Sequence, residues 1–254
     1  MAITEKLVQE LRSAPEYIKC IGYDQNNPYH YLPLDLHMQL AEEETERMVP
    51  LADRLILAAM LHDIGKPDCM TIDGKTGVCH FFGHAKKSAE IAERLLWNAG
   101  MSKESSEIVC WYIRHHDDFI SFGADAPKDH PFMRTVTREN VAEVILKSLI
   151  AIDGKDKDIN ATVRSVITGT RPAWGSQLPW KPLEFFVPAC AFHNLLVLCK
   201  ADAMAQSKSV VKPNGEILTR EERLYVLDRI EDEINNAYTL AVMRLEGIRK
   251  GVWP

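Results

Sequence analysis

The stretch "LILAAMLHDIGKPD", residues 55–68, is a run of aliphatic side chains that ends in a histidine and an aspartate, His62 and Asp63. Its pattern predicts a buried helix from about residue 51 to Asp63, which the following glycine and proline end. A buried carboxylate without a partner is strongly destabilising. The chain must therefore bring partners to this pair from elsewhere in its sequence.

The composition is that of a globular protein able to bury a substantial core. The chain has 254 residues, of which 46% are hydrophobic and 26% charged, and its net charge is −6. No apolar run approaches the length of about 18 residues that a membrane-spanning helix needs, and the N-terminus has no apolar signal-peptide centre. The six cysteines show no C-x-x-C pairing. We therefore expect a cytoplasmic protein with reduced thiols and no membrane contact.

The net negative charge of the chain also limits the partners that it is expected to bind. Domains that coat nucleic acid are usually basic, so we expect no stable sequence-specific DNA binding. A small phosphorylated substrate is compatible with the composition, because it needs only a local cluster of cations.

Hydrophobic periodicity predicts an all-α fold with one or two small β-hairpins, formed by one domain over residues 1–254. The hairpins surround Asp73-Gly74 and Asn214-Gly215, and Thr219 and Glu222 form a capping box before a last helix at about 220–250. Residues of about 120–188 form an insertion of helical patches and loops. Helices are predicted at about 3–13, 34–48, 51–63, 85–99, 103–116 and 188–206.

Ionisable side chains recur where this pattern predicts core: His37, His62, Asp63, His84, His115, His116 and Asp202. Any one of them has a simple structural explanation, since a lone histidine on an apolar face is usually a hydrogen-bonded core residue. Taken together, these residues indicate a different way to offset the cost of burying ionisable side chains. Imidazoles and carboxylates that converge on a divalent cation are no longer buried without partners.

The ordered pattern His37, His62-Asp63 and Asp202 resembles the HD superfamily of metal-dependent phosphohydrolases, which implies an α-helical HD-domain bundle. The segments "NNPYHYLPLDLHM", "AAMLHDIGKP", "FFGHAKKSAEIAERLL", "IRHH" and "LCKADAMAQ" resemble, more narrowly, the HD region of bacterial CCA-adding tRNA nucleotidyltransferases. The Gly-rich, paired-aspartate head of those enzymes is not found before residue 26. We therefore expect a free-standing HD hydrolase.

The resemblance implies one or two divalent transition-metal ions, chosen from Mn, Fe, Co, Ni and Zn. Asp63 would bridge the two ions. Asp153, in "SLIAIDGKD", is an alternative to Asp202 as the last ligand. The implied ligands are His37, His62, Asp63 and Asp202 for one ion, and His84, His115 and His116 for the other.

The implied function is phosphohydrolysis of a small nucleotide-like substrate or an RNA end, with a 2′,3′-cyclic phosphodiester or a phosphomonoester cleaved by a metal-activated water. Asp63 would orient that water, and Lys66 would supply a mobile positive charge to a phosphate oxygen. Lys86 and His30 are further candidate substrate contacts. Two alternatives stay open: a di-iron oxygenase like myo-inositol oxygenase, and a non-catalytic module that senses nucleotides or RNA.

Overall fold

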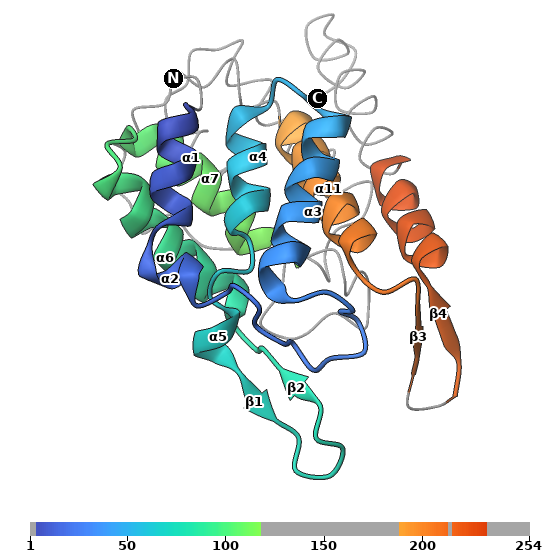
Figure 1. Cartoon of the computed structure of the whole chain (residues 1–254). Helices are drawn as coiled ribbons and strands as arrows, with labels where there is room; N and C mark the ends of the chain where they lie inside the picture. Colours follow the sequence, from blue (N-terminus) through green and yellow to red (C-terminus); the bar gives the residue numbers. More distant parts are fainter. Residues whose placement is uncertain (1–3, 118–187, 213–214, 233–254) are drawn as a thin grey trace, which may run out of the picture. The chain divides into compact units, whose positions relative to one another are not determined.

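A computed structural model describes residues 4–117, 188–212 and 215–232 (Figure 1). The chain divides into two compact units, of which the first comprises Met1–Asp117 and Val197–Val226. All described candidate site residues lie in the first unit. The single-domain organisation stays a prediction, and the predicted insertion at about 120–188 lies almost wholly outside the described residues.

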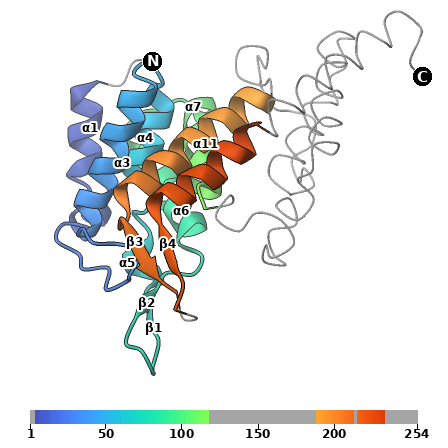
Figure 2. The same ribbon diagram turned by 90° about the vertical axis from the view of Figure 1, so that its right-hand side faces the viewer.

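The first unit is mostly helical, with two small antiparallel sheets, which confirms the predicted fold class. Helices α4 and α7 pack together, α3 packs on α4, and α6 packs on α7. Figure 2 shows α3 and α11 from the side of the β3–β4 hairpin. The labelled helices among the described residues are α1 (Glu5–Arg12), α2 (Pro15–Ile18), α3 (Leu34–Met48), α4 (Asp53–Leu61), α5 (Lys66–Cys69), α6 (His84–Asn98), α7 (Lys103–His115) and α11 (Pro188–Ala205).

Helix α4 carries the quoted aliphatic run and is buried continuously from Leu57 to Leu61. Leu57, Met60 and Leu61 are among its fully buried side chains. Burying each such side chain contributes about 1.5–3 kcal/mol, so α4 is a rigid support for the residues that follow it. His62, its C-cap residue, is therefore fixed in direction by the packing of the helix.

Helix α4 is the helix predicted at about 51–63, and it ends at Leu61, before Gly65 and Pro67. A short helix that the sequence does not predict, α5, begins at Lys66 with Pro67 in its first turn, where a proline costs no hydrogen bond. Packing also requires a glycine at position 65. A Cβ at this position would lie 2.6 Å from the backbone nitrogen of Ser88 on α6, and the Gly65 N–H donates to the Ser88 hydroxyl at 2.9 Å.

Both predicted hairpins are present. Strands β1 (Thr71–Ile72) and β2 (Cys79–His80) pair antiparallel, as do β3 (Ser209–Val211) and β4 (Ile217–Thr219). The capping box is confirmed as well. The Thr219 N–H donates to the Glu222 carboxylate at 2.8 Å, and the Glu222 N–H donates to the Thr219 hydroxyl at 3.1 Å. A helix follows over 220–232.

In the second unit, the structure describes the start of α11 and residues 227–232. Leu195 and Leu196 are buried, and His193 forms an ion pair with Glu231 at 2.6 Å. Five of the six cysteines have side chains that the structure describes, and these five are free thiols. No described helix has the length and apolar character needed to cross a membrane.

Candidate metal centre

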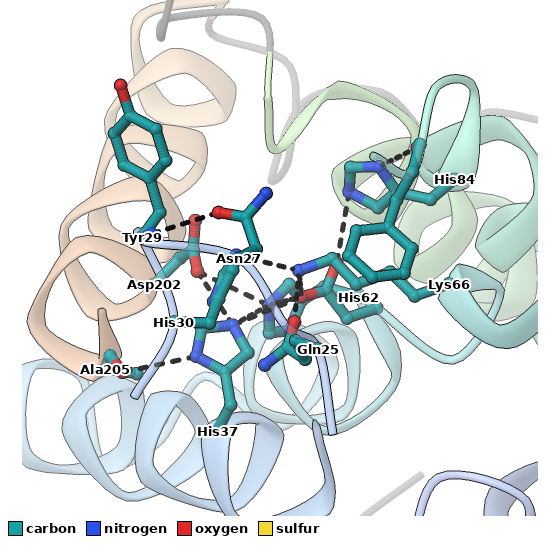
Figure 3. A network of polar contacts seen from close by, with 12 residues as sticks. Gln25, Asn27, Tyr29, His30, His37, His62, Lys66, His84, Asp202 and Ala205 are labelled. Carbon is teal, nitrogen blue, oxygen red and sulfur yellow. Dashed lines mark hydrogen bonds and ion pairs between the residues drawn. The ribbon is translucent and has the colours of Figure 1, made fainter. Parts of the chain in front are cut away.

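Four buried residues from three parts of the first unit converge on one point, and we call them the first ion group: His37, His62, Asp63 and Asp202. Helix α3 supplies His37, the end of α4 supplies His62, and α11 supplies Asp202 (Figure 3). Asp63 directly follows His62 in the chain. The His37 Nε2 lies 3.0 Å from the Asp202 Oδ1 and 3.1 Å from the Asp63 Oδ2. The His62 Nε2 lies 3.3 Å from that Asp63 oxygen and 3.6 Å from the Asp202 Oδ1.

The other oxygen of Asp63 faces a second ion group, formed by Asp63, His84 and His116. His84 is the first residue of α6, and His116 caps the end of α7. The Asp63 Oδ1 lies 3.1 Å from the His84 Nε2 and 3.6 Å from the His116 Nε2. One carboxylate therefore joins the two groups, with one oxygen directed at each.

The four histidines are oriented by the backbone. Their Nδ1 atoms face the carbonyl oxygens of Ala205 (His37, 3.3 Å), Ala59 (His62, 2.7 Å), Phe81 (His84, 2.8 Å) and Ile113 (His116, 2.7 Å). A ring nitrogen at this distance from a carbonyl must carry the proton that it donates. The opposite nitrogen, Nε2, is then the one available as a ligand, which is how metal-binding histidines are commonly fixed.

The electrostatics are those of cation-binding groups. Burial opposes the charged form of His62, but Asp63 and Asp202 outweigh burial and raise the pKa of His62 to about 10. Burial likewise opposes protonation of His84, and Asp117 and Asp63 raise its pKa to about 10. Burial also disfavours the ionised form of Asp63, yet Lys66 and His62 hold the pKa of that carboxyl well below its usual range. Both groups therefore attract positive charge strongly.

The arrangement fits metal ions. The Nε2 atoms of His37 and His62 are 3.3 Å apart, as are those of His84 and His116. Two neutral imidazoles cannot both be acceptors toward each other, so each pair needs a proton or a cation between its members. Ligand atoms around an ion with bonds of about 2.1 Å lie roughly 3 Å apart. The separations of 3.0–3.6 Å within both groups are of this size.

Lys66 lies beside this centre, as predicted, but it is not a mobile charge. Only 3% of the residue is exposed. Its ammonium lies 2.6 Å from the Asp63 Oδ2 and donates to the Gln25 Oε1 at 2.9 Å and to the His30 Nε2 at 3.1 Å. An ammonium has three N–H donors, so all three are engaged. The expectation of mobility came from the glycine and proline around Lys66, whereas α5 holds its backbone.

His30 is close to the centre, in the loop before α3. Burial and the adjacent Lys66 ammonium lower the pKa of His30 to about 2, so the ring is neutral and accepts from Lys66. Its ring lies edge-on to that of His37, with the centroids 4.7 Å apart. The role of His30 as a substrate contact stays a prediction.

Three other sequence candidates are placed differently. The ring of His115 lies against Trp111, with centroids 5.1 Å apart, and His115 belongs to neither ion group among the described residues. Lys86 is exposed on α6, two residues after His84, and successive helical positions differ by about 100°, which turns it away from that histidine. Asp153 lies outside the described residues, whereas Asp202 is within the first ion group.

Four residues near the centre were not singled out from the sequence. Asp117 lies 3.0 Å from the His84 Nε2, and Gln25 holds Lys66. Gln206 donates to the Asp202 Oδ2 at 3.0 Å, and the Cys199 thiol donates to the backbone carbonyl of His116 at 2.9 Å. For Asp117 a signal existed, because it directly follows the histidine pair. Gln25 lies in a polar loop with no sequence feature that marks it as functional, so its contact with Lys66 can be identified only from the tertiary structure.

Comparison with known proteins gives a consistent result. The family model described as HD domain matches residues 34–163, just over half of the chain. The CC-adding tRNA nucleotidyltransferase of Thermus thermophilus is 35% identical over 105 residues, which cover 41% of this chain and 24% of that protein.

Two bifunctional uridylyltransferase/uridylyl-removing enzymes are also similar. The protein of Cereibacter sphaeroides is 28% identical over 120 residues, and that of Rhodospirillum rubrum is 33% identical over 125 residues. These matches cover 40% and 42% of this chain. The matched region spans only 12–24% of the length of these relatives, so the similarity concerns one region of each.

Proposed function

The chain belongs to the HD-domain family, and from this premise we propose that it is a metal-dependent phosphohydrolase acting on nucleotide-like phosphoesters. A buried cluster of histidines and aspartates is typical of such hydrolases in this family. The observation that carries the proposal is the convergence of four Nε2 atoms on the two oxygens of Asp63.

We assign His37, His62, Asp63 and Asp202 to one divalent ion, and Asp63, His84 and His116 to a second. Nitrogen and carboxylate donors suit Mn, Fe, Co, Ni or Zn, and no cysteine belongs to either group within the described residues. Bound ions would supply a water of lowered pKa and positive charge for phosphoryl oxygens. The residues of the chain fix the ligand directions through the four backbone contacts of their Nδ1 atoms.

Asp63 and Lys66 are the proposed catalytic pair. The ammonium holds one carboxylate oxygen of Asp63 at 2.6 Å, which fixes the plane of the bridging group. A phosphate oxygen could reach Lys66 only by replacing one of its partners. His30 is the partner with the longest contact, at 3.1 Å, so we propose that substrate displaces His30 from Lys66. Lys86 stays a predicted contact for a more distant part of the substrate.

The relatives support the choice of substrate class. One is named for adding nucleotides to tRNA, and two are named in part for removing a uridylyl group. All three names concern nucleotidyl groups, whose attachment is a phosphoester. We therefore propose a 2′,3′-cyclic phosphodiester or a phosphomonoester of a nucleotide or RNA end as the substrate.

The test is a substrate screen of metal-reconstituted protein. Protein stripped with a chelator and loaded with Mn²⁺, Co²⁺ or Ni²⁺ should hydrolyse an aryl phosphoester and at least one member of a panel of 2′,3′-cyclic and monophosphate nucleotides. His62→Ala should be inactive. If the loaded wild-type protein cleaved nothing in the panel, the hydrolase proposal would fail.

The same screen separates the two alternatives. Hydrolysis that is unchanged without oxygen eliminates the di-iron oxygenase, whereas oxygen consumption by iron-loaded protein would favour it. The non-catalytic sensor predicts that a nucleotide binds with no turnover. Equilibrium binding measured beside the activity assay distinguishes this outcome.

A further inference from the structure

Asp117 is the first residue after the histidine pair that ends α7, and it lies against the second ion group. Its Oδ2 is 3.0 Å from the His84 Nε2, and its Oδ1 is 3.5 Å from the His116 Nε2. These two nitrogen atoms are also the ones that face the Asp63 Oδ1. The side chain of Asp117 is 31% exposed, so this carboxylate borders the solvent side of the group.

The two ion groups become equivalent when Asp117 is counted. In the first group, Asp202 lies 3.0 and 3.6 Å from the Nε2 atoms of two histidines, and Asp63 completes the set. In the second group, Asp117 lies 3.0 and 3.5 Å from the two corresponding atoms, and Asp63 again completes the set. Each group then has two imidazoles, one carboxylate of its own and one oxygen of the shared carboxylate.

His115 cannot take this place while His116 keeps its own. Neighbouring residues of an α-helix point about 100° apart, so only one member of the pair faces His84. That member is His116, and the ring of His115 lies against Trp111 instead. Asp117 follows in the turn beyond the helix, and its carboxylate lies at the centre.

We propose that Asp117 is a protein ligand of the second ion, in the role that the resemblance to the HD superfamily implies for His115. This inference rests on the metal-binding part of the proposed function. With Asp117, three carboxylates and one ammonium surround the two ions. The added carboxylate shifts the second group toward the oxygen donors preferred by Mn²⁺ over softer ions. Its position at the solvent border makes Asp117 the outermost of the proposed ligands.

Metal binding tests the proposal without any activity measurement. Wild-type protein, Asp117→Asn and Asp117→Glu are stripped, titrated with Mn²⁺ by calorimetry and analysed for bound metal after dialysis. We expect two Mn²⁺ per wild-type chain. Asp117→Asn should keep one ion at wild-type affinity and bind the second at least about tenfold more weakly, because even the loss of a residue supporting a ligand costs that much. Asp117→Glu should recover part of this loss.

Two controls complete the design. Asp68→Asn changes a surface carboxylate that pairs with Lys19 at 3.5 Å, and it should bind both ions as the wild type does. His115→Gln should also keep both. Circular dichroism and thermal denaturation establish that each variant is folded.

Four results would overturn the inference: two ions of unchanged affinity in Asp117→Asn, a single ion in the wild type, loss of both ions in folded Asp117→Asn, or loss of the second ion in His115→Gln. Failure of the proposed function gives a different result. A wild-type protein that binds two ions and hydrolyses nothing would refute the hydrolase and leave Asp117 as a ligand.

Discussion

The two ion groups share Asp63 and use the same kinds of ligand, yet they differ in how the fold encloses them. The first group is buried in all its members, and its histidines sit on α3 and at the end of the central helix α4. The second group lies at the start of α6 and the end of α7, where the side chain of His84 is 13% exposed and that of Asp117 is 31% exposed. The ligand types of the two groups are similar, but their exposure to solvent differs.

The difference indicates a division of work between the groups. An ion enclosed by the first group would be held by ligands that cannot move without disturbing the core. An ion in the second group would lie nearer to solvent, because the side chains of His84 and Asp117 are partly exposed. Lys66 contacts the Asp63 oxygen of the first group and thereby fixes the shared ligand.

The largest effect should come from the residue that joins the groups. Asp63→Ala should remove both ions and reduce hydrolysis to background, because each group loses the oxygen directed at it. Metal analysis after dialysis measures this directly, with Asp68→Ala as the matched surface control and Asp202→Ala expected to lose only the first ion. If Asp63→Ala retained one ion at full occupancy, the groups would not depend on a shared ligand.

A smaller effect is expected at the lysine that supports this ligand. Lys66→Met should keep both ions but lower kcat/KM about 10²–10³-fold, the usual cost of losing one group that stabilises developing charge. Steady-state kinetics beside metal analysis checks both parts. Lys87→Met is the matched control, because Lys87 is only half-buried and its Asp68 contact is 4.0 Å long. Equal activity in the two variants would show that Lys66 has only a structural role.

The comparison also shows what a sequence can and cannot supply. For the first group, helical periodicity assigns His37, Asp63 and Asp202 to core positions, and the resemblance to the HD superfamily implies that they share an ion. In the second group, His115 and His116 are adjacent, and no sequence pattern tells which one faces inward. The rotation of α7 about its own axis, relative to α6, decides which histidine faces inward. That rotation depends on packing between residues that are distant in the chain.

The immobilisation of the Lys66 ammonium could not be predicted from the sequence either. A mobile charge is expected at Lys66 from the sequence, but α5 and the loop residues Gln25 and His30 immobilise the ammonium. The sequence predicts Gly65 as a helix terminator. In the structure its lack of a side chain also matters for packing, because a Cβ at this position would lie 2.6 Å from the backbone nitrogen of Ser88 on α6. Such roles arise from close approaches in space, which leave no periodic signal.

The smallest expected effect is a difference in the pH dependence of stability between the metal-free and the metal-loaded protein. Burial opposes the charged forms of His62 and His84, but neighbouring carboxylates raise the pKa of each to about 10, above the ordinary value of about 6.5. Their contribution to stability is therefore fully present below pH 6.5 and is lost as the pH rises through about 10. In the loaded protein, ions replace these protons, so that loss should disappear.

Thermal denaturation at pH 7, 8.5 and 10 checks this expectation. The metal-free protein should lose more stability than the loaded protein, and each 1 kcal/mol corresponds to a Tm change of about 2–4 °C in a protein of this size. The variants His62→Gln and His84→Gln measure how much of this pH-dependent loss of stability comes from each ion group. The share of His84 should be the smaller, because its side chain is 13% exposed while that of His62 is fully buried. Equal losses in the metal-free and loaded proteins would mean that the imidazoles are not where the cations bind, and the proposed metal centre would have to be abandoned.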